Sequence, residues 1–200
     1  MSRLIYIGLY KKDPTNVLRL AHASDLSSFS FFNRSTASQY LNFATRTAVN
    51  ETQFGTRTNI SVDVQNITYM VHTYVAQDGL SVALVTDSLY PRSTINHLID
   101  STMKEYRVNF DEWMNVCIDQ NNEPAFLSIP LKQKPEEIDV LAKITNDVAE
   151  IKEIMYQNIE SILSRGEKLD DLLKKSEDLD RQSKEFTKVA KKLRCCPWFR

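Results

Sequence analysis

Residues 159–179 read IESILSRGEKLDDLLKKSEDL, and this stretch shows how the second half of the chain is organised. Ile162, Arg165, Leu169 and Leu172 follow one another at steps of three, four and three residues. Such alternation has an average period of 3.5 residues, which keeps one stripe of side chains facing partner helices when helices supercoil. The stretch therefore predicts a coiled-coil helix.

The same register continues in both directions along the chain, and its positions form a stripe that we call the seam. The seam positions, most of them apolar, are Leu141, Ile144, Val148, Ile151, Met155, Asn158, Ile162, Arg165, Leu169, Leu172, Ser176, Leu179, Ser183, Phe186, Ala190 and Leu193. A helix of this length would span about 80 Å at 1.5 Å per residue, too long to pack wholly against a small domain. We therefore expect it to need partner helices.

One seam position carries a charge. The guanidinium of Arg165 would lose its hydration inside a bundle, so it needs hydrogen-bond acceptors at the same level. In a parallel homodimer two such arginines would face each other, at a cost in free energy. In a bundle of different helices, a single arginine can instead donate hydrogen bonds to the amide oxygens of its neighbours. Arg165 therefore favours a hetero-oligomer. A homodimeric coiled coil attached to a sensor or scaffold domain is the alternative.

The residues before the heptads predict a folded α+β domain of about 120 residues. Period-two apolar runs bounded by turn residues indicate strands, and apolar stripes at helical spacing indicate helices. The expected strands are 4–10, 17–21, 59–64, 69–75 and 80–85, and the expected helices are 34–49 and 91–106. This order describes an antiparallel five-stranded sheet covered by helices.

The first expected helix has a core-facing stripe and one aromatic residue outside it. The stripe consists of Ala37, Tyr40, Leu41, Ala44 and Ala48. Phe43 lies well off this stripe, and two interpretations of it are open. It is either a solvent-facing aromatic available to cover another part of the chain or a local core contact.

A change in composition separates the domain from the heptads. Pro124, Pro130 and Pro135 interrupt regular structure between residues 119 and 135, which predicts a linker, with a short helix at 125–131 as the alternative for part of it. The predicted organisation is a regulatory domain at 1–118, a linker at 119–135, a coiled-coil motif at 136–194 and a tail at 195–200.

The tail predicts attachment to a membrane surface. Two adjacent cysteines, Cys195 and Cys196, follow a cluster of basic side chains. The cluster consists of Lys188, Lys191, Lys192 and Arg194. One lipid chain binds a bilayer reversibly, whereas two chains, or one chain and a basic patch, hold stably. Because no apolar run approaches the roughly 20 residues that span a bilayer, we expect attachment through lipidation, with two unmodified thiols as the alternative.

Several classes of function are disfavoured. The net charge of −1 argues against nucleic-acid binding, because neutralising phosphates needs a clustered excess of Lys and Arg over acidic residues. His22, His72 and His97 lack the spacing of a metal site and are expected to be structural or solvent-facing. Cys117 is expected to be a small packed residue. With no phosphate-binding glycine loop or nucleophile motif in the sequence, we expect no catalysis, no cofactor and no small-molecule substrate.

Residues 159–179 resemble the centre of the R-SNARE motif, with Arg165 matching the arginine of its central ionic layer. The N-terminal domain resembles the longin domain, a profilin-like five-stranded antiparallel sheet between helices. The stretch 31–35, Phe-Phe-Asn-Arg-Ser, and the pair Cys195-Cys196 are similar to the lipid-anchored branch of longin R-SNAREs in the synaptobrevin-like superfamily, which lacks the transmembrane helix.

This resemblance implies a function in membrane fusion. The chain would contribute one helix to a parallel four-helix bundle with three glutamine-bearing SNARE helices, on the cytosolic face of endomembranes such as ER, Golgi and endosome or vacuole. The longin surface around Phe43 would restrain residues 136–194 in an autoinhibited state until partners arrive.

The resemblance also implies a prenyl group on Cys196 and a palmitoyl group on Cys195. A prenylation box places its cysteine fourth from the end, where this sequence has Pro197, because the chain continues to Arg200. The chemical type of the lipid therefore stays open.

Overall fold

The computed structural model describes residues 2–29, 34–64, 67–139 and 154–162, all of which fall in one compact unit, Met1–Leu163. Of the predicted seam, Met155, Asn158 and Ile162 are described. The other seam positions, among them Arg165, lie outside the described residues, as do Cys195 and Cys196.

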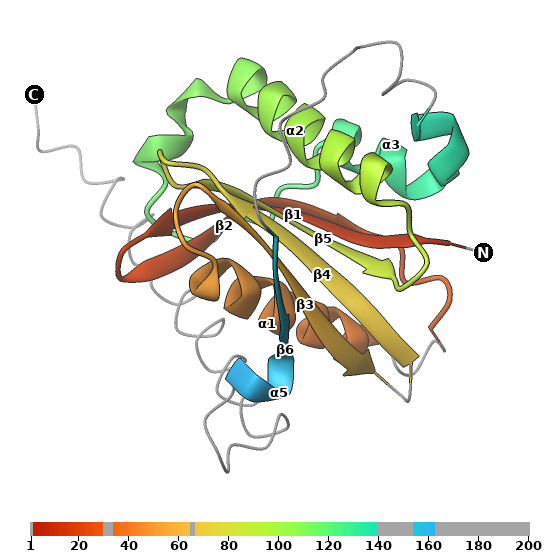
Figure 1. The fold of residues 1–200 in the computed structure, drawn as a ribbon. Coiled ribbons are helices and arrows are strands. Elements are labelled where there is room, and N and C mark those ends of the chain that lie inside the picture. Colours follow the sequence, from red (N-terminus) through yellow and green to blue (C-terminus); the bar gives the residue numbers. More distant parts are fainter. Residues whose placement is uncertain (1, 30–33, 65–66, 140–153, 163–200) are drawn as a thin grey trace, which may run out of the picture. The chain divides into compact units, whose positions relative to one another are not determined.

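The described elements occur along the chain as runs of strands separated by helices (Figure 1). In order they are β1 (Leu4–Asp13), β2 (Asn16–Ser24), α1 (Arg34–Glu51), β3 (Thr56–Val64), β4 (Ile67–Val75), β5 (Leu80–Asp87), α2 (Arg92–Asn109), the 3-10 helix η2 (Asp111–Asn115), α3 (Ala125–Lys132), β6 (Ile154–Asn158) and α5 (Ile159–Ile162). The strands form one sheet in the order β2-β1-β5-β4-β3-β6. Four neighbouring pairs are antiparallel, and β3 with β6 is parallel.

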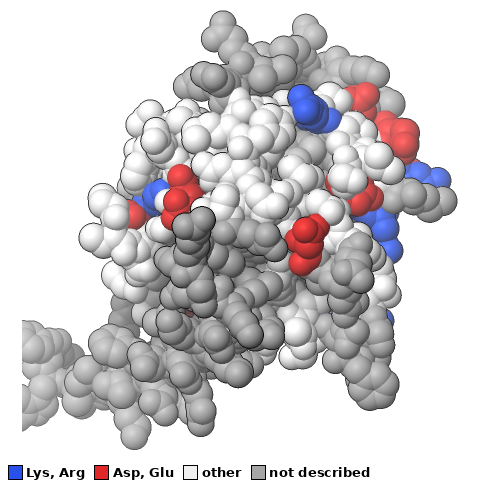
Figure 2. Space-filling view, turned by 60° about the horizontal axis from the view of Figure 1, so that its bottom comes forward, with Lys and Arg blue, Asp and Glu red and all other residues white. Residues whose placement is uncertain are grey.

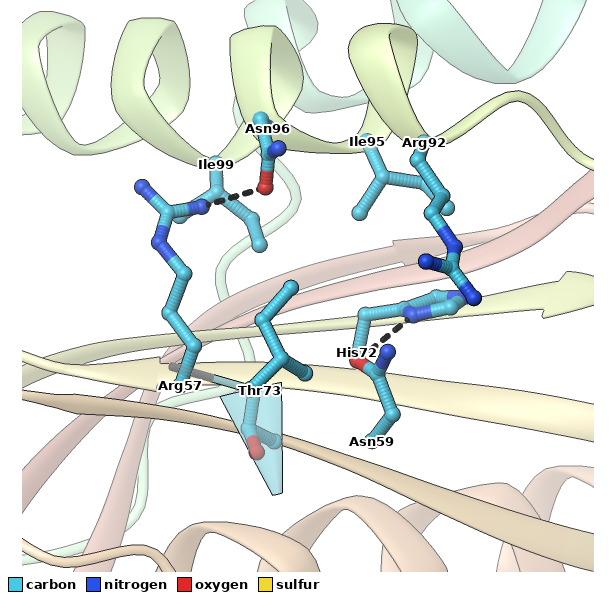
Figure 3. A pocket seen from close by; sticks show the side chains of 9 residues that line it. Arg57, Asn59, His72, Thr73, Arg92, Ile95, Asn96 and Ile99 are labelled. Atoms are coloured by element: carbon cyan, nitrogen blue, oxygen red, sulfur yellow. Dashed lines mark hydrogen bonds between the residues drawn. The ribbon is translucent and has the colours of Figure 1, made fainter. Parts of the chain in front are cut away.

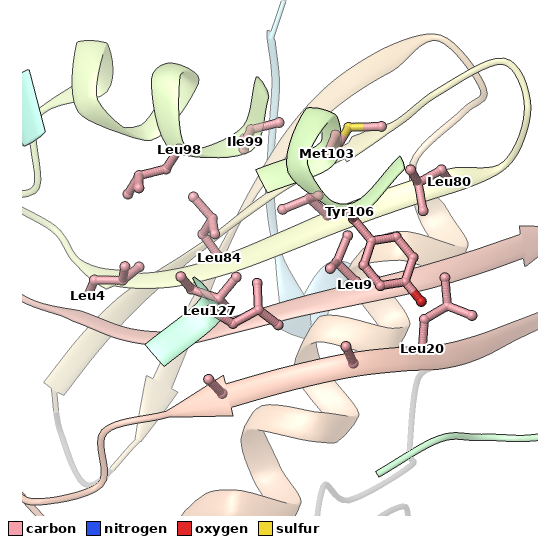
Figure 4. Close-up of a cluster of buried hydrophobic side chains, with 14 of the residues drawn as sticks. Leu4, Leu9, Leu20, Leu80, Leu84, Leu98, Ile99, Met103, Tyr106 and Leu127 are labelled. Atoms are coloured by element: carbon pink, nitrogen blue, oxygen red, sulfur yellow. The ribbon is translucent and has the colours of Figure 1, made fainter. Parts of the chain in front are cut away.

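The sheet is covered on both faces, with α1 on one and α2 and α3 on the other (Figure 1). Successive side chains of a strand point to opposite faces, so β1 serves both layers. Leu9 packs with Leu98 and Met103 of α2 and with Leu127 of α3 in the main core cluster (Figure 4). Tyr10 points to the other face and bonds to Thr45 of α1, with 2.7 Å between the hydroxyl oxygens.

The predicted α+β class, the five strands and the two long helices are confirmed, with strand ends extended by a few residues. The predicted stripe of α1 is buried at all of its positions, while Phe43 is half-buried. The expected number of strands is wrong, because the sheet has six. The additional strand, β6, comes from residues whose heptad spacing predicts a helix.

The segment predicted as a linker is packed against the domain. The backbone N–H of Gln120 donates a hydrogen bond to the carbonyl oxygen of Arg19 in β2 (2.7 Å). The Arg19 guanidinium donates another to the side-chain oxygen of Asn121 (2.9 Å). The Asp119 carboxylate pairs with Arg46 of α1. Residues 119–122 thus line the outer edge of β2, and α3 follows with Leu127 fully buried. Three prolines therefore did not prevent ordered structure, since bonds to β2 and the core hold this segment.

Candidate functional site

The outer edge of β3 is where the predicted coiled-coil motif meets the sheet. β6 lies along this edge in parallel register, with Arg57 opposite Ile154, Asn59 opposite Tyr156 and Ser61 opposite Asn158. An unpaired edge strand exposes a row of backbone donors and acceptors, and β6 covers that row along residues 57–61 of β3. Parallel pairing is slightly less stable per residue than antiparallel pairing, and β6 has five residues. The edge is therefore covered by a short, parallel strand.

A small pocket lies between this edge and α2 (Figure 3). Polar and charged side chains from β3, β4 and α2 converge there, together with Ile154 of β6. The lining residues are Arg57, Asn59, His72, Thr73, Arg92, Ile95, Asn96, Ile99 and Ile154. The pocket thus joins the sheet, α2 and the coiled-coil motif at one place.

Arg57 fixes the position of β3 under α2. Its guanidinium donates to Asn96 Oδ1 at 2.9 Å and to Asp100 Oδ1 at 2.7 Å, both on α2. It also lies 4.9 Å from the centre of the Tyr74 ring. The Arg57 side chain is only 11% exposed, so this ion pair is shielded from solvent more than an ordinary surface pair. The β3 edge is consequently held rigidly against α2.

His72 is buried at the floor of this pocket. Hydrogen bonds of 2.9 Å join Nδ1 to Asn59 Oδ1 and Nε2 to Thr86 Oγ1. Burial, with a smaller contribution from the charge of Arg92, lowers the pKa of His72 to about 4. His72 is therefore neutral at physiological pH and structural in role, as the sequence predicts.

We expect His72 to make the domain sensitive to acid. Its folded-state pKa lies below the usual value of 6.5, so the unfolded chain binds the extra proton first, and stability is lost as pH falls from about 6.5 towards 4. Urea unfolding at pH 7.5 and pH 5 should show a loss of about 2 kcal/mol attributable to this group. His72→Gln should reduce the loss, whereas the control His97→Gln should keep it. An unchanged pH dependence in His72→Gln would contradict this assignment.

The described seam positions are not assembled into a seam. Met155 is 45% exposed, Asn158 is exposed and Ile162 is half-buried. The buried residue of this segment is Ile159, 4% exposed, which the heptad register places outside the seam. The segment thus packs against the domain through Ile159, and not through the seam residues that would face partner helices in a coiled coil.

The side chains of β6 are divided between the two faces of the sheet. Ile154 lines the pocket on the α2 side, and the Tyr156 ring lies 5.5 Å from the Arg92 guanidinium on the same side. By strand alternation Met155 and Gln157 point to the α1 side. The sequence reasoning missed this strand, although Ile-Met-Tyr at 154–156 is a run with high β propensity.

Helix α1 is poor in charged residues. Within α1 the charged residues are Arg34, Arg46 and Glu51. Figure 2, which brings forward the lower part of Figure 1, shows charged side chains of both signs mainly towards the sides of the described surface, with uncharged residues between them. Phe43 belongs to this helix, and its side chain is half-buried, which leaves both interpretations of its role open.

Cys117 is exposed, so its expected packing is wrong. It follows η2 in an irregular segment, and its thiol lies 3.4 Å from the Asn115 carbonyl oxygen instead of in the core. Within the described ranges, no cluster of His, Cys, Asp or Glu could hold a metal ion. No helix in this part of the chain is long and apolar enough to cross a membrane.

The longin-like sheet domain holds part of a heptad motif on its edge, as expected for a longin-type SNARE protein. Comparisons with known proteins support this class. The family model described as Synaptobrevin matches residues 140–200. Three fungal relatives, each called a synaptobrevin homolog ykt6, are similar along nearly their whole length: 33% identity in Schizosaccharomyces pombe, 33% in Saccharomyces cerevisiae and 35% in Debaryomyces hansenii.

Each alignment covers 97% of this chain and 98% of the relative. The chain belongs to the synaptobrevin family, the R-SNAREs of vesicle fusion, whose members work with partner SNARE helices. The predicted class is confirmed.

Proposed function

We propose that this R-SNARE alternates between a closed state, with residues 154–158 paired to β3, and an open state in which residues 136–194 form one helix of a four-helix bundle. The observation that carries the proposal is the pairing of β6, part of the predicted coiled-coil motif, with the edge of the longin-like domain. Residues 1–118 would act as the regulatory domain.

The closed state would inhibit assembly by imposing the wrong backbone conformation. Met155 and Asn158 are exposed rather than covered, so the sheet does not hide these two seam side chains. It holds them in an extended strand, where side chains alternate every two residues and cannot form a stripe with a 3.5-residue period. Partner helices can therefore engage this part of the motif only after β6 has left β3.

In the open state, Arg165 would form the central layer with the amide side chains of three glutamine-bearing helices. The seam positions on both sides of it would pack against the same partners, from Leu141 to Leu193. The zippering of such a bundle would draw a vesicle and its target membrane together. In this function the sheet domain sets when fusion begins, and the bundle supplies the energy.

The tail would provide the membrane anchor. Lipids on Cys195 and Cys196, strengthened by the basic cluster before them, would hold the chain on the cytosolic face of endomembranes of the secretory and endosomal or vacuolar system. The close similarity to the fungal relatives supports a place in intracellular trafficking.

Arg165→Leu tests the nature of the bundle. In a SNARE complex the substitution should leave buried glutamine amides without a partner, at a cost of about 1–3 kcal/mol each, and lower the melting temperature of the complex. The free chain should remain monomeric in both forms. Glu167→Leu, which adds the same apolar side chain outside the seam, is the control and should leave the complex stable. A chain that pairs with itself, and does so more tightly as Arg165→Leu, would instead be a homodimerising scaffold.

Phe43→Glu tests the autoinhibitory surface on α1. Met155 and Gln157 point to the α1 side, where α1 carries few charges, so a carboxylate at position 43 should weaken the closed state. Binding of the separate domain, residues 1–135, to a peptide of residues 136–194 should weaken measurably in calorimetry. Asn50→Glu, exposed near the end of α1, is the control. Unchanged binding by Phe43→Glu would assign Phe43 to the domain core.

A further inference from the structure

Tyr156 has different surroundings in the β6 strand and in the proposed helix of the bundle. It follows the seam residue Met155 and precedes the next seam residue, Asn158, by two positions. In the helical heptad this is a position on the side away from the seam. Tyr156 would therefore face solvent in a four-helix bundle, where it contributes little to packing.

In the strand conformation the same residue makes a specific contact. Tyr156 pairs in register with Asn59 of β3, and its ring lies 5.5 Å from the guanidinium of Arg92, the first residue of α2. Ile154, two residues earlier on the same face, lines the same pocket as Arg92. A guanidinium within about 6 Å of an aromatic ring centre attracts it through a cation–π interaction. Arg92 thus holds β6 from the α2 side.

We propose that Tyr156 is a positioning residue dedicated to the closed state, which, together with Arg92, sets how readily β6 leaves β3 and takes no part in the bundle. This inference rests on the proposed closed state and assigns its release to one pair of side chains. Within residues 154–158, Tyr156 then stabilises the strand conformation, whereas Met155 and Asn158 stabilise the helical bundle.

The contact is suited to adjusting the equilibrium without locking it. Tyr156 is 53% exposed and Arg92 is exposed, so the interaction has the strength of a surface cation–π pair. Its loss should raise the open population by roughly two- to fivefold. A five-residue parallel strand has few other contacts of this kind, so such a change is large enough to alter the assembly rate.

The experiment compares variants of the full-length chain: Tyr156→Ala, Arg92→Gln, the double variant, and the conservative Tyr156→Phe, which keeps the ring. Three quantities are measured for each. They are hydrogen exchange of the β3 amides, the rate of assembly with three glutamine-bearing SNARE helices, and the melting temperature of the finished complex. Met155→Ala, one residue away but in the seam, is the matched reference.

Tyr156→Ala and Arg92→Gln should each speed β3 exchange and assembly by roughly two- to fivefold, with no further gain in the double variant and no change in the melting temperature. Tyr156→Phe should behave as wild type, and Met155→Ala should lower the melting temperature. Unchanged exchange and assembly rate in Tyr156→Ala, or a melting temperature lowered as in Met155→Ala, would overturn the inference while the closed state stands. Unprotected β3 amides in the wild-type chain would overturn the closed state itself.

Discussion

The structure depends on one constraint, which is that the backbone groups on the outer edge of β3 need hydrogen-bond partners. An uncovered edge of nine residues invites pairing with other chains. At the opposite edge of the sheet, β2 is covered by residues 119–122, which are held by Arg19 and by the Asp119–Arg46 pair. At β3 the cover is β6, which the chain takes from its own coiled-coil motif.

Under the proposed exchange, this arrangement would link the stability of the sheet to the regulation of fusion. The β2 cover is fixed by an ion pair and buried polar groups, whereas the β3 cover is short, parallel and half-exposed. In the proposed open state, partner helices would offer residues 154–158 an alternative in which Met155 and Asn158 enter a packed seam. The Arg57–Asp100 pair joins β3 to α2 independently of β6. In the proposed open state the domain would therefore not need to unfold when the motif leaves.

Local patterns predicted most of the fold. Period-two runs located five strands, the stripe of Ala37, Tyr40 and Ala48 located α1, and the seam with Arg165 pointed to the family. β6 was missed because Met155 and Asn158 fit a helical register so well that the β propensity of Ile154 and Tyr156 was overlooked. Arg57 and Arg92 were also missed, since nothing in their local sequence shows that tertiary packing brings β3, α2 and β6 together.

The most direct test of the strand-to-helix exchange is NMR of the full-length chain, alone and in complex with three glutamine-bearing SNARE helices. Carbon chemical shifts of residues 154–158 should be those of a strand in the free chain, with cross-strand contacts from Tyr156 to Asn59, and those of a helix in the complex. Helical or random-coil shifts in the free chain, without contacts to β3, would contradict the exchange.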